Sequence, residues 1–270
     1  MTGLKIVQID ATTLPDAWYQ TMYAAIEHGR KFKIDRGSYA GQQRLEFDFA
    51  VIHIRQPGID PVIPSMPEGS NMPPPFDEEY LARYVSYVWE NQPPDANESY
   101  TYGQRMRAAE IPAQMTTERL DRCGVYLDPA EWVSPAVKEH NSILFPYVLD
   151  QMELLIRTYK THGHRNNQMC LQIAQPTDML LKDPPCCRHL DTRIQDGKLH
   201  FFPYFRSWDL FGGFPANLAA IELMKRHCAS EIGVENGEII ASSKGLHLYD
   251  HVWGIAEALR GKAIRAQKED

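Results

Sequence analysis

The stretch from residue 183 to residue 251 decides the fold, and it contains three short motifs: DPPCC at 183–187, FRSWDLFGGFPAN at 205–217 and GLHLY at 245–249. In the first motif, Cys186 directly follows two prolines, which do not fit inside a regular helix or a central strand. We therefore expect Cys186 at a bend or at the end of a strand, where a ligand can reach its thiol.

A reactive cysteine needs positive charge nearby, because the thiolate is the nucleophile and arginines lower the pKa of a thiol. Three arginines are candidates for this role: Arg165, Arg188 and Arg206. The competing interpretation is that Cys186 is a small buried residue, which is the more common environment of a lone cysteine. The motifs that follow Cys186 favour the reactive interpretation.

The order of these motifs resembles the thymidylate synthase family, whose core reads roughly P-C-H, then R-S-x-D-x-x-x-G-x-P-x-N, then H-x-Y. The counterparts here are Pro185-Cys186-Cys187, then Arg206-Ser207-Trp208-Asp209 with Gly213, Pro215 and Asn217, then His247-Leu248-Tyr249. The match is clearest over residues 150–251. It implies an α+β fold of the thymidylate synthase type, with a mixed β-sheet and packed helices in a single domain over residues 1–270.

Weaker matches extend the resemblance toward the N-terminus. Asp35-Arg36-Gly37-Ser38 resembles the family's phosphate-binding D-R-T-G turn, and Tyr102-Gly103-Gln104-Arg105 resembles its Y-G-x-x-W-R segment. The version Tyr100-Thr101-Tyr102-Gly103 is more similar to the shorter archaeal and hydroxymethylase-like branches than to the common bacterial enzyme.

The resemblance implies a covalent reaction on a pyrimidine nucleoside monophosphate. Cys186 would add to C6 of the base, and C5 would then attack the methylene carbon of the co-substrate 5,10-methylenetetrahydrofolate. The other catalytic residues that it implies are Asp209 and Tyr102, together with a glutamate for which Glu68, in the proline-rich loop, is our candidate. The residues implied for the reduced folate are Trp89, Asp209 and Gly213.

The implied nucleotide-binding residues have polar side chains that suit a phosphate, a sugar or a base edge. An arginine fork binds phosphate in bidentate fashion, an amide offers one donor and one acceptor, and residues at i and i+2 of a strand lie on one face. The set is Arg36, Arg165, Arg206, Ser207, Asn217, His247 and Tyr249. Arg165 would reach the phosphate across the interface of a homodimer.

Four features depart from the family's pattern. Cys187 stands where the family has a histidine, and only Arg165 is available where the family has paired arginines. The last residues, AIRAQKED at 263–270, are charged, whereas many family members end in an apolar tail that closes over the folate. The glutamate that helps to move protons has no motif, and Glu68 is our candidate for it.

These departures bear on the last step, because a site that excludes water protects the exocyclic methylene intermediate. Hydride from the folate gives a methyl group, and water gives a hydroxymethyl group. The charged tail favours water, while Trp89 lies near the place of a family tryptophan that favours hydride. We expect 5-hydroxymethylation of a cytidylate (CMP or dCMP). The alternatives are thymidylate synthesis (dUMP to dTMP) and a nucleotide-binding homologue that has lost catalysis.

Two positions leave the substrate open. The amide of Asn217 fits uracil in one orientation and cytosine when it is flipped. Ala216 is small where the common enzymes have a phenylalanine, so that the sequence leaves ribose and deoxyribose both possible.

The composition argues against several other classes of protein. The 270 residues carry a net charge of −7, with a pI of about 5.8, which does not suggest a nucleic-acid or anionic-membrane partner. The five cysteines contain no C-x-x-C pair, so we expect no metal site. Without a secretory signal or an 18-residue apolar stretch, we expect a reduced cytoplasmic protein with no membrane partner.

The periodicity of apolar residues predicts the main elements. Helices are expected at 16–29, 77–89 with Asp77 as N-cap, 146–162, 215–232 opened by Pro215, and 252–260. Strands are expected at 44–56, 168–175, 197–206 and 238–249, and the proline-rich stretch 57–75 is expected to be an irregular loop.

Overall fold

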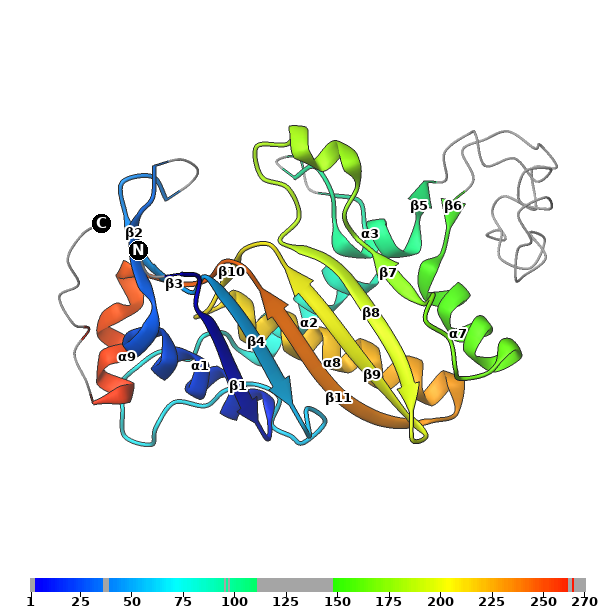
Figure 1. The fold of residues 1–270 in the computed structure, drawn as a ribbon, viewed down its shortest axis with the longest axis horizontal. Helices are drawn as coiled ribbons and strands as arrows, with labels where there is room; N and C mark the ends of the chain where they lie inside the picture. Colours follow the sequence, from blue (N-terminus) through cyan, green and yellow to red (C-terminus); the bar gives the residue numbers. More distant parts are fainter. Residues whose placement is uncertain are drawn as a thin grey trace.

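Helices and strands are combined in an α+β arrangement, which confirms the expected fold class (Figure 1). The structure is a computed structural model that describes residues 3–35, 39–94, 96, 98–110, 148–261 and 264. Helices α1 (Leu14–His28), α2 (Glu78–Trp89) and α8 (Gly213–Ile232) lie behind the largest sheet in the view of Figure 1. The other face of that sheet carries no helix among the described residues.

The largest sheet has six strands in the order β1-β4-β11-β9-β8-β7. These strands are β1 (Ile6–Ala11), β4 (Phe49–Ile54), β7 (Cys170–Gln172), β8 (Cys187–Gln195), β9 (Lys198–Phe205) and β11 (Glu235–Ser243). The sheet is mixed, because β1 and β4 run parallel, as do β9 and β11, and the other neighbours are antiparallel. Asp196 and Gly197 join β8 to β9 with positive φ at both positions, as a two-residue hairpin turn requires.

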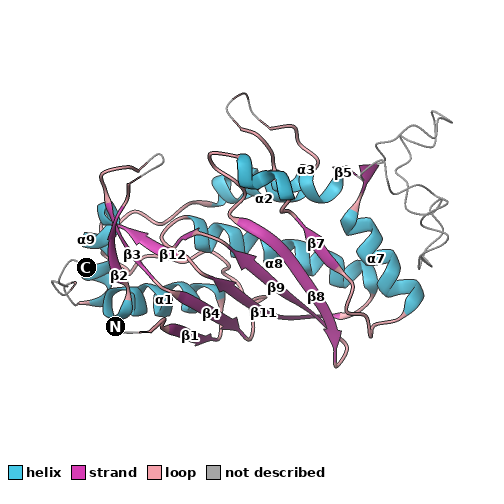
Figure 2. Ribbon diagram, turned by 45° about the horizontal axis from the view of Figure 1, so that its top comes forward, coloured by secondary structure: helices cyan, strands magenta, loops and turns pink. Residues whose placement is uncertain are grey.

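A four-stranded sheet, in the order β10-β12-β3-β2, lies beside the large one (Figure 2). Its strands are β2 (Arg30–Lys33), β3 (Gln43–Glu46), β10 (Trp208–Asp209) and β12 (Leu246–Tyr249). The pairing of β10 with β12 sets Asp209 opposite His247. A further pair, β5 (Ala109–Glu110) with β6 (Val148–Leu149), is antiparallel.

Two strands that the periodicity predicts as continuous are broken. The stretch 44–56 becomes β3 and β4, which belong to different sheets. At the break, the carboxylate of Asp48 accepts a hydrogen bond from the backbone N–H of Lys5 at 2.7 Å and pairs with Arg30 at 2.9 Å. The stretch 238–249 is likewise divided into β11 and β12, around Gly245.

Four of the predicted helices form close to their expected bounds, the helix expected at 146–162 is shortened to Gln151–His162 because Val148–Leu149 is a strand, and α3 (Tyr102–Arg107) was not predicted. The helices are α1 (Leu14–His28), α2 (Glu78–Trp89), α3 (Tyr102–Arg107), α7 (Gln151–His162), α8 (Gly213–Ile232) and α9 (Trp253–Arg260), with short 3-10 turns at Pro176–Leu180 and Asp250–Val252. Asp77 caps α2 by accepting from the N–H of Tyr80, as expected. The long helix begins at Gly213, two residues before Pro215, which therefore lies in its first turn.

The centre of the core is α8, since 14 of its 20 residues are buried. Ala216 and Ala219 on this helix pack with Phe76 and Leu81, which fixes α2 against it. Gly103 allows α3 to approach the end of α2, because a Cβ at this position would lie 1.7 Å from the carbonyl oxygen of Glu90. These contacts bring α2, α3 and the first turn of α8 to the bend that precedes β8.

Candidate active site

Cys186 lies at the bend directly before β8, as the two preceding prolines predict. It is half-buried, and its carbonyl oxygen accepts a hydrogen bond from the backbone N–H of Arg206 at 2.9 Å. This bond ties the bend to the end of β9. The thiol of Cys186 thus has a fixed backbone around it and partial access from outside.

The guanidinium of Arg206 donates hydrogen bonds to the turn that precedes Cys186. Its Nε donates to the carbonyl oxygen of Pro185 at 3.2 Å, and its Nη2 donates to the carbonyl oxygen of Pro184 at 2.5 Å. The same Nη2 lies 3.2 Å from the carboxylate of Asp183. Arg206 therefore holds the loop in place and keeps its charge beside the thiol.

The pKa of the Cys186 thiol is raised, because the effect of burial exceeds that of the nearby arginines. Arg206 and Arg188 lower this pKa, whereas Asp183 and Asp209 raise it. Two of the three expected arginines are thus present. Arg165 lies beside Arg193 near the other end of β8, away from the thiol.

Asp209 holds the turn that leads into α8. Its carboxylate accepts from the backbone N–H groups of Phe211 at 3.2 Å, Gly212 at 3.0 Å and Gly213 at 2.9 Å. A carboxylate at this position satisfies donors of the first helical turn that have no partner within the helix. The D-L-F-G-G run is therefore a capped turn with Gly213 at its end, and Ser207 is half-buried at the bend before β10.

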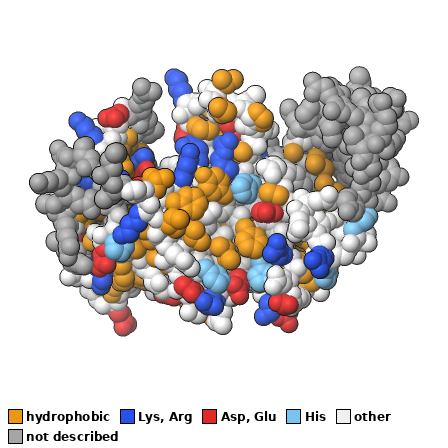
Figure 3. Space-filling model, viewed as in Figure 1, with side chains coloured by type: hydrophobic (Ala, Val, Ile, Leu, Met, Phe, Trp, Pro, Cys, Tyr) orange, Lys and Arg blue, Asp and Glu red, His pale blue; other side chains and the backbone are white. Residues whose placement is uncertain are grey.

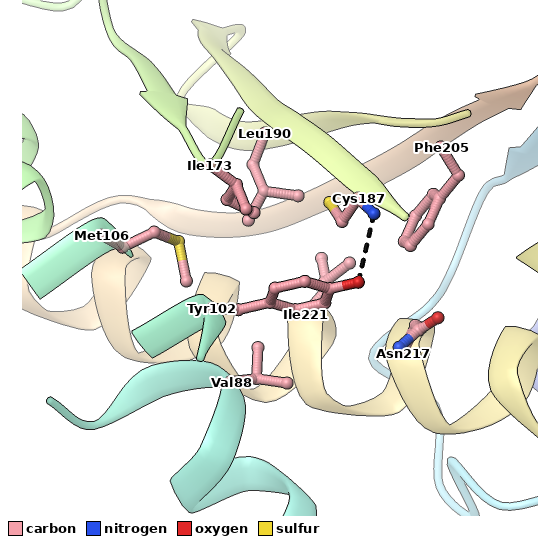
Figure 4. A pocket seen from close by; sticks show the side chains of 9 residues that line it. All are labelled: Val88, Tyr102, Met106, Ile173, Cys187, Leu190, Phe205, Asn217 and Ile221. Carbon is pink, nitrogen blue, oxygen red and sulfur yellow. Dashed lines mark hydrogen bonds between the residues drawn. The ribbon is translucent and has the colours of Figure 1, made fainter. Parts of the chain in front are cut away.

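Asn217 lies in the first turns of α8 with both ends of its amide engaged. Its Oδ1 accepts from the indole Nε1 of Trp208 at 2.7 Å, and its Nδ2 donates to the hydroxyl of Tyr84. Asn217 is 8% exposed and lines a small cavity of about 10 Å³, near the minimum that one water molecule needs. Figure 4 shows its amide nitrogen on the side of Tyr102 and Ile221.

His247 keeps one ring nitrogen available. Its Nδ1–H donates to the carbonyl oxygen of Gly245 at 2.8 Å, while its buried Nε2 has no hydrogen-bond partner among the described residues. Burial lowers the pKa of His247 to about 4, so the ring is neutral near pH 7 and Nε2 is an acceptor. The edge of this ring meets Tyr249, with centroids 4.6 Å apart, and burial raises the pKa of Tyr249 to about 12.

Two residues that sequence reasoning missed share the sheet face of His247 and Tyr249. Glu46 lies opposite His247, and Arg44 lies opposite Tyr249, with Arg44 and Glu46 paired at 2.7 Å. The only signal in the sequence was their i, i+2 spacing on the predicted strand.

A cluster of tyrosines covers Cys186 from the side of α2 and α3. Tyr84, Tyr87, Tyr100 and Tyr102 all have raised pKa values, mainly through burial and in part through Cys186. The hydroxyl of Tyr102 accepts from the backbone N–H of Cys187 at 3.2 Å (Figure 4). Sequence reasoning identified only Tyr102 in this cluster. The i, i+3 spacing of Tyr84 and Tyr87 on a predicted helix was the signal for the others.

Four of the expected site residues lie elsewhere or cannot be placed. Glu68 is exposed in the proline-rich loop, and Trp89 packs against His227, ten residues beyond Asn217 on α8 and thus about 15 Å further along the helix axis. Arg165 lines a hollow with Arg193 near the end of β8 that is opposite to Cys186. Arg36 lies outside the described residues, as does the charged tail except for residue 264.

The described part of the chain contains no group of His, Cys, Asp and Glu side chains that is suited to a metal ion. Within the same residues, no helix has both the length and the apolar character to cross a bilayer.

Comparisons with known proteins agree with this geometry. The family model for thymidylate synthase matches residues 79–267. Proteins of Methanosarcina barkeri and Methanosarcina mazei, both named provisionally as thymidylate synthases, are 26% and 28% identical over 249 residues, or 92% of each chain. The structure of thermostable thymidylate synthase A from Bacillus subtilis has a similar fold, with a TM-score of 0.59 and 14% identity over 94% of this chain and 86% of that one.

Proposed function

Because the chain belongs to the thymidylate synthase family and is therefore a one-carbon transferase that uses 5,10-methylenetetrahydrofolate, we propose that Cys186 is its nucleophile toward a pyrimidine nucleoside monophosphate. The observation that carries this proposal is the bend at Cys186, where Arg206 and the tyrosine cluster act on one half-buried thiol and Asn217 is bonded to Tyr84 of that cluster. The family match covers about 70% of the chain and includes this bend.

The proposed reaction begins when the thiolate of Cys186 forms a bond to C6 of the base, which makes C5 nucleophilic. C5 then bonds to the methylene carbon of the folate as the first of that carbon's two carbon–nitrogen bonds breaks, and C5 loses its proton. Cleavage of the second carbon–nitrogen bond releases tetrahydrofolate and leaves an exocyclic methylene on C5. Either hydride from the tetrahydrofolate or water adds to the resulting exocyclic methylene, and the thiolate leaves C6. The first outcome gives a methyl group and dihydrofolate, and the second gives a hydroxymethyl group and tetrahydrofolate.

The polar groups around Cys186 support binding of a nucleotide. The unpartnered Nε2 of His247 can accept a hydrogen bond from a sugar hydroxyl, and the protonated hydroxyl of Tyr249 can donate one. A buried acceptor without a partner is costly, so a ligand hydroxyl at Nε2 would offset that cost. Arg206 is the proposed phosphate ligand, for which it must exchange part of its contact with the 183–185 turn.

We propose 5-hydroxymethylation of a cytidylate, CMP or dCMP, as the reaction. The location of Trp89 supports it, since a tryptophan that packs against His227 cannot shield an intermediate near Cys186 from water. Thymidylate synthesis from dUMP is the second candidate, and the names of the Methanosarcina relatives favour it.

One assay separates the two reactions. The protein is incubated with 5,10-methylenetetrahydrofolate and one nucleotide at a time: UMP, dUMP, CMP or dCMP. The molecular mass of each product is then determined. We expect a cytidylate to gain the mass of CH₂O without formation of dihydrofolate. If dUMP gains CH₂ with an equal amount of dihydrofolate, the protein is a thymidylate synthase and the hydroxymethylase proposal is wrong.

We further propose a homodimer that uses the face of the large sheet that carries no helix among the described residues. Side chains that point to this face are apolar along its centre, and Figure 3 shows hydrophobic side chains gathered there. They are Phe49, Val51, Phe202, Tyr204 and Ile240. Arg193 is exposed on the same face and lines a hollow with Arg165, so Arg165 lies at the border of the proposed interface.

The dimer proposal predicts complementation between two inactive variants. We expect Arg165→Ala and Cys186→Ser each to be inactive alone, because one lacks the phosphate ligand and the other the nucleophile. In mixed dimers, one site combines Cys186 of one subunit with Arg165 of the other. Co-refolded subunits should therefore regain roughly a quarter of wild-type activity, if pairing is statistical. A monomer by light scattering, or a mixture without activity, contradicts the shared site.

A further inference from the structure

We propose that Trp208 determines which pyrimidine base the protein accepts, because its indole N–H fixes the amide of Asn217 in one orientation. This inference rests on the proposed function, in which Asn217 contacts the edge of the base. It identifies Trp208 as a positioning residue, since Trp208 would act through Asn217 rather than by contact with the base.

The orientation of the amide follows from the chemistry of its partner. An indole nitrogen only donates, so the amide atom that lies 2.7 Å from Nε1 of Trp208 must be the oxygen of Asn217. Tyr84 bonds to the nitrogen end, but a hydroxyl both donates and accepts and would tolerate either orientation. Trp208 alone therefore sets the orientation.

Trp208 is held too firmly to adapt to a flipped amide. Its side chain is 2% exposed, and its ring stacks on Phe205 with centroids 3.9 Å apart and planes 5° apart. Phe214 packs against the ring at 4.6 Å. Because the indole cannot turn away, a flip of Asn217 would leave a buried N–H facing an NH₂ group.

The two bases need opposite orientations of the same amide. Uracil presents a donor at N3 and an acceptor at O4, and cytosine presents an acceptor at N3 and a donor at N4. After its bonds to Trp208 and Tyr84, Asn217 has one oxygen lone pair and one N–H left for a ligand. A base bound through C6 at Cys186 meets these two groups in one pose, so only one of the two patterns is satisfied.

The expected discrimination follows from the cost of an unsatisfied buried donor. The energy of such a group corresponds to a factor of roughly 5 to 150 in a dissociation constant. The test uses Trp208→Phe, which removes the N–H and retains an aromatic ring between Phe205 and Phe214. The dissociation constants of wild type and variant are measured calorimetrically for UMP and CMP, and for dUMP and dCMP.

We expect wild type to prefer one base within each pair by at least about 5-fold. Trp208→Phe should reduce this ratio of dissociation constants toward one, mainly through tighter binding of the disfavoured base.

Two variants serve as controls. Trp18→Phe also removes a buried indole N–H, which donates to the carbonyl oxygens of Leu210 and Phe211 at 3.1 Å, and it should leave the ratio unchanged. Tyr84→Phe should weaken binding of both bases and keep the ratio.

Three outcomes overturn the inference while the proposed function stands: equal affinity of wild type for both bases, a ratio that Trp208→Phe leaves unchanged, or an equal change of ratio in Trp18→Phe. A wild-type protein that binds none of the four nucleotides instead contradicts the proposed function, and the inference with it.

Discussion

Release of tritium from C5 of the nucleotide should fall by at least about 10⁴-fold in the Cys186→Ser variant, because loss of a catalytic nucleophile costs a factor of this order or more. Only a covalent adduct at C6 makes C5 acidic enough to exchange, and a serine hydroxyl is a far weaker nucleophile than a thiolate. The measurement uses a nucleotide labelled at C5, 5,10-methylenetetrahydrofolate and purified protein, with the released tritium counted in water. It does not depend on whether hydride or water completes the reaction.

The matched control for Cys186→Ser is the same substitution at Cys170. Cys170 is another half-buried cysteine, on β7, and burial raises its pKa to about 11. Cys170→Ser should keep tritium release within a few fold of wild type, since the side chain lies outside the cluster at Cys186. Tritium release that survives Cys186→Ser would remove the nucleophile from the proposal. A wild type that binds nucleotide and releases no tritium would favour the homologue without catalysis.

The local conformation at the centre of the proposed site follows the motifs because their structural constraints are local. Two prolines before Cys186 force a bend wherever the segment lies, and Asp209 in the run D-L-F-G-G accepts from N–H groups at the start of the next helix. The expected positions of Cys186, Arg206 and Asn217 therefore agree with one another in the structure. Glu68 and Trp89 belong to no such motif, and an approximate place along the chain carries no local constraint.

Long-range partners escaped prediction for a physical reason. The motif treats position 208 as variable, so it predicts no role for Trp208. The bond from Trp208 to Asn217 forms only because the turn before α8 brings the start of that helix back toward the indole. Tyr84 and Tyr87 belong to a helix that was predicted correctly, but which of its faces would meet Cys186 depends on tertiary packing. The hairpin signal Asp196-Gly197 was present in the sequence and would have predicted β8 as the partner of β9.

The two broken strands have a similar origin. In the stretch 44–56 the buried positions change phase, since 45 and 47 are buried before the break and 50, 52 and 54 after it. Residues 49–52 are apolar at every position, so the pattern does not show which face is buried there. Asp48 at the break pairs with Arg30 of β2, a contact between segments that periodicity does not predict.

The reactivity of Cys186 should respond in opposite directions to changes in its two nearest charges. Arg206 lowers the pKa of the thiol and Asp183 raises it. In Arg206→Gln the thiolate loses a neighbouring cation, so the pKa of Cys186 rises and alkylation by iodoacetamide should require higher pH. In Asp183→Asn the thiolate loses a neighbouring anion, so the same profile should move to lower pH. Alkylation is followed across pH, with Cys186 identified by mass spectrometry.

Arg206→Lys separates charge from geometry in the same experiment. A lysine keeps the positive charge but lacks the planar fork that donates to Pro184 and Pro185 and binds phosphate in bidentate fashion. The alkylation profile of Arg206→Lys should therefore stay near that of wild type. In Arg206→Gln, kcat/KM should fall by roughly 10²- to 10³-fold, since a partly buried charged partner of the phosphate is lost. If Arg206→Gln and Asp183→Asn shift the profile in the same direction, local unfolding of the 183–185 turn dominates, and Arg206 acts as a clamp on the loop rather than through its charge.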